Sequence, residues 1–170
     1  MQDQEYENIK QRLNRVTREL AKLEERKSRA INSLSGLPGY ESSSDEDSDS
    51  PFPPINRPSR FEILGMCSDL EEQKSILTIQ LEAYGAAQPG AANLKEAESS
   101  IAKQELASIR DTITGLEKME KETFSRMCDS MPSFDHTGEY WDAKREHTWL
   151  LYELASMRQL KHSISRTFID

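Results

Sequence analysis

The first 34 residues carry apolar side chains at alternating steps of three and four positions, interrupted only at Lys27. This spacing places the apolar residues on one narrow seam of a helix, which is the heptad pattern of a coiled coil. Because the positions between them are almost all charged or polar, we expect the seam to pack against another helix. The predicted partner-binding residues at the centre of the seam are Ile9, Leu13, Val16, Leu20 and Leu23.

The heptad register does not specify a parallel homodimer. Parallel two-stranded coiled coils prefer β-branched residues at position a and leucine at position d. Here Ile9 and Val16 occupy d positions instead. The pattern therefore favours a different protein as the partner of residues 1–34, with a homo-oligomer as the alternative.

Residues 35–58 are predicted to form a disordered acidic linker. Their central tract, from residue 42 to residue 50, contains only serine, aspartate and glutamate, so it offers nothing apolar to bury. Three of its serines precede an acidic residue by three positions, as acidophilic kinases require, and a fourth precedes a proline. The predicted phosphorylation sites are Ser42, Ser43, Ser44 and Ser50, and each phosphate would add about −1.5 to −2 charges.

The remaining residues, 59–170, are predicted to contain three more helices, over about 60–84, 94–131 and 138–168. Ser59 with Glu62, and Asn93 with Glu96, have the spacing of capping boxes. The short connection between the last two helices favours an antiparallel hairpin. We therefore expect an all-α fold in which these helices form a bundle or, alternatively, an elongated coiled coil.

The last predicted helix concentrates aromatic residues. Tyr140 and Trp141 are adjacent, and Trp149 neighbours the seam residue Leu150, so they cannot all share one narrow seam. They fit either a wide core between packed helices or an exposed partner-binding surface. We count these three aromatic residues among the candidate partner-binding residues, and we expect His147, on the apolar face, to be a hydrogen-bonded core histidine.

Composition and charge narrow the expected class of protein. Charged residues make up 31% of the chain and hydrophobic residues only 35%, which favours long helices over an ordinary globular core. The net charge is −8 and no segment is strongly basic, so nucleic acid is not an expected partner. No apolar run is long enough to span a membrane, and the start of the chain lacks the features of a signal peptide. We expect an intracellular protein, cytoplasmic or nuclear rather than secreted.

No motif in the sequence indicates catalysis. Metalloprotease, phosphate-loop and serine-hydrolase signatures are missing, and Cys67 and Cys128 are too isolated for a disulfide framework or a zinc site. We expect no enzyme activity, no cofactor and no metal. The predicted function is a coiled-coil subunit or adaptor of a multiprotein assembly with a phosphoregulated linker. The alternative is a regulatory subunit of a chromatin- or RNA-associated complex that uses the mildly basic residues 1–34.

Overall fold

The computed structural model describes residues 2–34, 58–87, 91–131 and 138–169. Its helices are α1 (Gln2–Leu34), α2 (Arg60–Ala86), α3 (Ala91–Asp129) and α4 (Gly138–Phe168). No strand occurs in these four ranges, so the all-α prediction is confirmed. The predicted linker lies outside the described residues except at its last position, Pro58.

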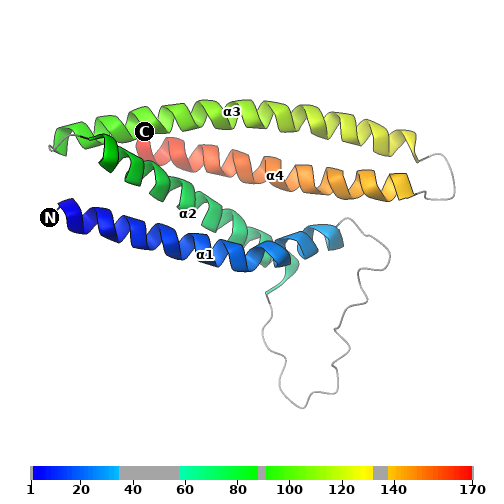
Figure 1. The fold of residues 1–170 in the computed structure, drawn as a ribbon. Coiled ribbons are helices and arrows are strands. Elements are labelled where there is room, and N and C mark those ends of the chain that lie inside the picture. Colours follow the sequence, from blue (N-terminus) through cyan, green and yellow to red (C-terminus); the bar gives the residue numbers. More distant parts are fainter. Residues whose placement is uncertain (1, 35–57, 88–90, 132–137, 170) are drawn as a thin grey trace, which may run out of the picture.

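Successive helices run in opposite directions, and the two ends of the chain lie at the same end of the bundle (Figure 1). α3 and α4 lie side by side as the predicted antiparallel hairpin. α1 packs along α2, and α2 crosses obliquely from α1 towards the start of α3. The helices therefore form two pairs, α1 with α2 and α3 with α4, which are joined mainly through α2.

Hydrogen bonding at the start of α2 confirms the first predicted capping box. The backbone N–H of Glu62 donates to Ser59 Oγ at 3.2 Å, and the Glu62 carboxylate accepts from the backbone N–H of Ser59. Hydrogen bonding of the Glu62 carboxyl to the backbone and then the side chain of Ser59 lowers its pKa. The cap fixes where the chain turns into α2.

The second predicted capping box is wrong. α3 begins at Ala91, so Asn93 lies inside the helix and does not cap it. Alanine has the highest helix propensity of all residues, and the pair Ala91–Ala92 extends α3 ahead of the polar signal that the sequence offers. The other helix boundaries differ from the predicted ones by at most two residues.

The core is divided into clusters that follow the two helix pairs. The largest lies between α2, α3 and α4 and comprises Ile79, Ala102, Leu106, Ile109, Leu160 and Ile164. A second cluster joins α1 to α2 around Leu77. A third joins the end of α1 to Leu64 of α2 and to Tyr152 of α4. α1 is therefore fastened along its length to α2 and at its C-terminal part to α4 as well.

His147 is a hydrogen-bonded histidine in the α3–α4 interface, as expected. Its Nε2 lies 2.8 Å from Glu120 Oε1 of α3, and both side chains are mostly buried. Its ring centroid lies 5.5 Å from that of Phe124. His147 and Glu120 therefore satisfy each other's hydrogen bonding within the α3–α4 interface.

Tyr84 makes the stability of the fold depend on pH in the alkaline range. Burial, together with a hydrogen bond to Glu5 and the charges of Glu5 and Glu98, raises the pKa of Tyr84 to about 12. In the unfolded chain its pKa is about 10. Below that value Tyr84 is neutral in both states. Above it, only the unfolded chain ionises at first, so stability is lost as the pH rises towards about 12.

We expect the Tyr84→Phe variant to lose less stability than the wild type between about pH 10 and about pH 12. Urea unfolding of both proteins at neutral pH and within this alkaline window measures the difference. Other tyrosines and lysines contribute equally to both proteins, so they cancel. Parallel loss of stability in the two proteins would contradict the assignment.

Gly115 is an exposed glycine in the interior of α3, and a Cβ at this position would meet no atom within 4 Å. Glycine in a helix interior is less favourable than alanine by about 1 kcal/mol. We therefore expect Gly115→Ala to raise the free energy of unfolding by about 0.5–1 kcal/mol. Chemical denaturation checks this expectation, and Gly65→Ala in α2, where space is also open, should behave alike. A destabilised Gly115→Ala variant would refute it.

Within the part of the chain that the structure describes, none of the helices combines the length and apolarity needed to cross a bilayer. This agrees with the prediction of no membrane span.

Candidate functional site

The predicted seam residues lie at the interface between α1 and α2 of the same chain. All of them except Leu23 belong to one cluster with Leu77 of α2. Three are buried and two are half-buried, namely Ile9, Val16 and Leu23, then Leu13 and Leu20. In this structure α2 occupies the place that the sequence assigns to a helix of another protein. The binding of these residues to a partner protein stays a prediction.

The predicted aromatic residues of α4 do not form one surface. Tyr140 is buried, and its ring makes an edge-on contact with Trp141 at 5.3 Å between centroids. Lys144 Nζ lies 4.9 Å from the Trp141 ring centroid and 5.9 Å from that of Tyr140. Trp149, two turns further along, is 42% exposed. The core interpretation therefore applies to Tyr140, whereas Trp149 is exposed and its binding to a partner protein stays a prediction.

The predicted phosphorylation sites Ser42, Ser43, Ser44 and Ser50 lie outside the described residues. They stay predictions.

Lys27, the one interruption of the α1 seam, is the centre of a polar cluster between three helices. Its Nζ lies 2.7 Å from Glu71 Oε1 of α2 and 3.4 Å from Glu153 Oε1 of α4. The same atom lies 4.8 Å from the ring centroid of Tyr152. Ser156 Oγ donates to the second Glu71 oxygen at 3.1 Å. A lysine is tolerated in this seam because carboxylates from two other helices neutralise it.

The polar cluster continues along α2 and α4. Ser68 Oγ lies 3.4 Å from Ser156 Oγ and donates to Gln159 Oε1 at 3.2 Å. Gln159 Nε2 in turn donates to Glu72 Oε2 at 3.1 Å. Among the described residues, no buried side-chain nitrogen or oxygen lacks a hydrogen-bond partner. The cluster is a complete network that connects α2 to α4.

Lys27 and Tyr152 of this cluster, and Cys67 beside it, have raised pKa values. Burial alone would lower the pKa of Lys27, but the hydrogen bond to Glu71 and the charges of Glu153 and Glu71 outweigh it, and the pKa rises. Burial, aided by the charge of Glu71, raises the pKa of Tyr152. Burial also raises the pKa of the Cys67 thiol, which makes it a weak nucleophile. These groups suit a structural role better than proton transfer near neutral pH.

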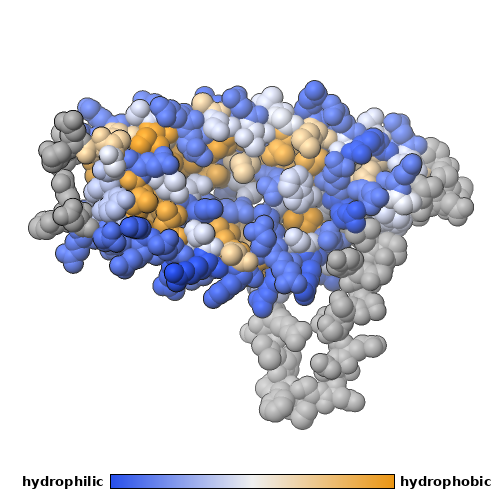
Figure 2. Space-filling model, in the orientation of Figure 1, coloured by the Kyte–Doolittle hydropathy of each residue, from blue (hydrophilic) through white to orange (hydrophobic). Residues whose placement is uncertain are grey.

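Beside this cluster an open groove of about 490 Å³ lies between the two helix pairs. Figure 2 shows apolar and charged side chains alternating on the face between α1 and the α3–α4 pair. The floor of the groove is apolar and contains Leu20, Ile79, Ile101, Met157 and Leu160. Its rim carries six glutamates from all four helices, Glu24, Glu71, Glu72, Glu82, Glu105 and Glu153. We call this feature the acidic groove.

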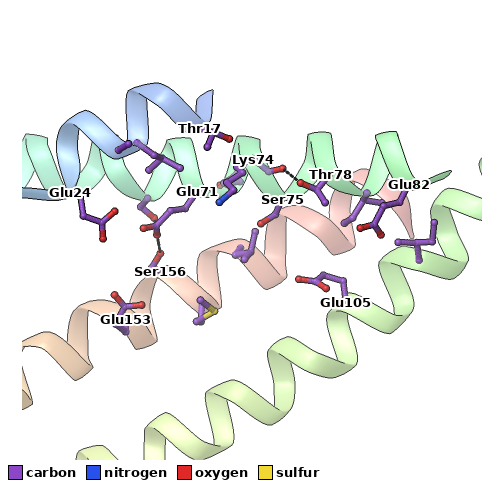
Figure 3. A pocket seen from close by; sticks show the side chains of 18 residues that line it. Thr17, Glu24, Glu71, Lys74, Ser75, Thr78, Glu82, Glu105, Glu153 and Ser156 are labelled. Atoms are coloured by element: carbon purple, nitrogen blue, oxygen red, sulfur yellow. Dashed lines mark hydrogen bonds between the residues drawn. The ribbon is translucent and has the colours of Figure 1, made fainter. Parts of the chain in front are cut away.

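The charges of the acidic groove are unbalanced. Lys74 is the one cationic side chain among its lining residues. Glu24, Glu82 and Glu105 make no ion pair with any side chain that the structure describes. Figure 3 shows their carboxylates facing the groove from three different helices. The groove therefore presents separated negative charges above an apolar surface.

The carboxylates of the acidic groove are not arranged as a metal site. In the described part of the chain no three histidine, cysteine or acidic side chains stand close enough together to hold a metal ion. The negative charges are instead distributed along the groove. Such an arrangement suits a long ligand with several positive charges better than one small cation.

Sequence reasoning missed both the polar cluster and the acidic groove. The signal for the cluster was present, because a single lysine in an otherwise apolar seam implies buried or nearby acidic partners. The identity of those partners was not readable, since Glu71 and Glu153 lie far along the chain. The groove had no local signal, because it arises from the oblique course of α2 between the other helices.

The chain matches no protein-family model, no curated protein and no solved structure.

Proposed function

We propose that this chain is a non-enzymatic subunit or adaptor of a multiprotein assembly, and that its helical bundle binds another protein in the acidic groove. One observation carries the proposal, namely the open groove between the two helix pairs, whose floor combines the half-buried Leu20, Ile101 and Met157 with buried core residues. Apolar surface that is only partly covered and is rimmed by polar groups is typical of binding sites for other proteins. The exposed ring of Trp149 adds a second surface of the kind found at protein interfaces.

The polar cluster supports the non-enzymatic part of the proposal. A catalytic base or nucleophile needs a pKa near the working pH. The pKa values of Lys27 and Tyr152 in this cluster and of Cys67 beside it are all raised, although an activated lysine or thiol requires a lowered one. Glu71 and Glu153 hold Lys27 between α1, α2 and α4, which stabilises the walls of the groove.

A second candidate function rests on the outer face of α1. Arg15, Arg18 and Lys22 line a shallow surface depression on this helix. This basic face favours the alternative function, namely a regulatory subunit of a chromatin- or RNA-associated complex. Arg15 is paired with Glu19 at 3.0 Å, which weakens its attraction for phosphate. A gel-shift titration of the full chain with duplex DNA and with RNA at low salt tests this candidate, and a flat titration removes it.

The experiment for the first candidate compares two tryptophan variants of the full chain. Ser75→Trp places an indole in the groove, whereas Ser125→Trp places the same side chain on the exposed outer face of α3. Each protein is crosslinked to its neighbours in the cells that express it, and the crosslinked peptides are sequenced. Circular dichroism melting first shows that both variants keep the fold.

We expect crosslinks from the groove helices to another protein in the wild type and in Ser125→Trp, and their loss in Ser75→Trp. Identical crosslinked proteins in all three would overturn the groove as the binding site. Absence of any crosslinked protein in the wild type would overturn the adaptor function itself.

A further inference from the structure

We infer that the acidic groove takes a basic amphipathic helix from the partner protein, with apolar side chains on its floor and lysines or arginines against its rim. This inference rests on the proposed function and deepens it, because it states the chemistry of the partner. Three features of the groove carry it, namely its charge, its apolar floor and its length.

The first feature is charge. Of the six rim glutamates, Glu71 and Glu153 share Lys27, and Glu72 accepts a hydrogen bond from Gln159. The other three carboxylates have no cationic partner in the described chain. Each faces the groove, where a lysine or arginine of a bound helix would meet it (Figure 3). A rim whose charges are opposite in sign to those of the partner guides association and sets the register of the bound partner.

The second feature is the apolar floor. Ile79 and Leu160 belong to the main core, and Ile101 and Met157 pack against it while remaining half-buried. A ligand that carried only positive charge, such as a polyamine, would leave the half-buried Ile101 and Met157 in contact with water. A helix with one apolar stripe and one basic face would cover the floor and pair with the rim at once. The flexible side chain of Met157 lets the floor adapt to the apolar side chains of the bound helix.

The third feature is length. The groove-lining residues of α2 run from Ser68 to Glu82, which corresponds to about 21 Å of helix at 1.5 Å per residue. A partner helix of about 14 residues has this length. The apolar side chains along one face of such a helix recur at every third or fourth position, so they would reach the floor repeatedly along α2.

Charge also excludes two other occupants. Residues 35–58 of this chain carry five acidic side chains and one basic side chain, so the rim repels them, and phosphorylation would strengthen the repulsion. Nucleic acid meets the same repulsion. The groove therefore suits a segment from another chain.

The test uses the full chain and synthetic helical peptides of about 14 residues labelled with a fluorophore. The first peptide has leucines at i, i+3, i+4 and i+7 and lysines elsewhere. The second keeps the leucines and replaces lysine by glutamate. The third has the composition of the first but scatters the leucines around the helix. Fluorescence anisotropy measures the affinity of each peptide at low and at physiological salt.

The variants are two double charge reversals with equal change in net charge. Glu82→Lys with Glu105→Lys alters the rim of the groove. Glu96→Lys with Asp111→Lys alters exposed positions of α3 outside it. General attraction between a basic peptide and an acidic protein falls equally in both variants, so their difference reports binding in the groove.

We expect the amphipathic lysine peptide to bind more tightly than the other two peptides. We expect the groove variant to bind it about tenfold more weakly than the control variant does. Equal binding of all peptides, equal affinities of the two variants, or no binding of the lysine peptide would each overturn the inference. If the peptides do not bind while Ser75→Trp still abolishes the crosslinks, the proposed adaptor function stands and only the inference of a basic partner helix is overturned.

Discussion

Replacing Lys27 by methionine is expected to lower the free energy of unfolding by about 3 kcal/mol. The lysine side chain is only 14% exposed, and its charge lies between those of Glu71 and Glu153. Methionine preserves most of the apolar stem and the volume but removes the positive charge. Two partly buried carboxylates are then left to repel each other without a counter-ion, and this uncompensated charge causes most of the loss.

Urea unfolding followed by circular dichroism measures this effect, with Lys22→Met as the matched control. Lys22 lies on the same helix but is exposed, so its replacement should change stability by about 0.5 kcal/mol or less. The combination of Lys27→Met with Glu71→Gln and Glu153→Gln should recover much of the lost stability, because no unpaired charge remains. Equal stabilities of the two single variants would show that Lys27 is not paired as the structure has it.

The polar cluster around Lys27 also determines the register in which the α1 seam packs on α2. A heptad seam of aliphatic residues can slide by one repeat with little change in burial, whereas one polar residue in it fixes the register. Lys27 meets both of its carboxylates only where α1 lies opposite Glu71 and Glu153 at once. The pairing therefore selects one register on α2, and it also orients the α1–α2 pair relative to α4.

The elements that were predictable from the sequence are those specified by nearby residues. The spacing of Val16 within its heptad shows that it is buried, and Ser59 with Glu62 shows where α2 begins, because both signals act over a few residues. The start of α3 was missed because helix propensity at Ala91 extends the helix past the polar signal at Asn93. Local patterns thus identify helices and their buried faces.

Features that depend on residues far apart in the sequence were not predictable. Periodicity shows that the α1 seam needs a partner helix but not that Leu77 of the same chain supplies it. Likewise, the acidic groove depends on the angle at which α2 crosses between the helix pairs, and that angle follows from many packed side chains together. Glu105 and Glu24 appear as ordinary surface residues in the sequence, and only the fold brings them to one groove.

Shortening Leu150 to alanine is expected to lower the free energy of unfolding by about 3–4 kcal/mol. This side chain is 0% exposed and is among the largest fully buried side chains of the described residues, so its loss leaves a cavity. The adjacent Leu151 is 48% exposed, and Leu151→Ala should cost about 1 kcal/mol or less. The two variants share one helix, one substitution and one sequence neighbourhood. A similar loss in both would contradict the packing of α4.

The Leu150→Ala variant also tests whether the two helix pairs unfold together. Both tryptophans lie in α4, so their fluorescence reports the α3–α4 pair, whereas circular dichroism reports all four helices. Ile79 of α2 belongs to the same cluster as Leu160 and Ile164 of α4, and Lys27 ties α1 to Glu153. Because these contacts cross between the pairs, we expect the fluorescence and dichroism transitions to coincide in wild type and variant alike. A dichroism transition that continues after the fluorescence change is complete would mean that α1 and α2 survive on their own. The contacts between the two helix pairs would then break before α1 and α2 unfold, and the ion pairs of Lys27 would not be enough to hold the pairs together.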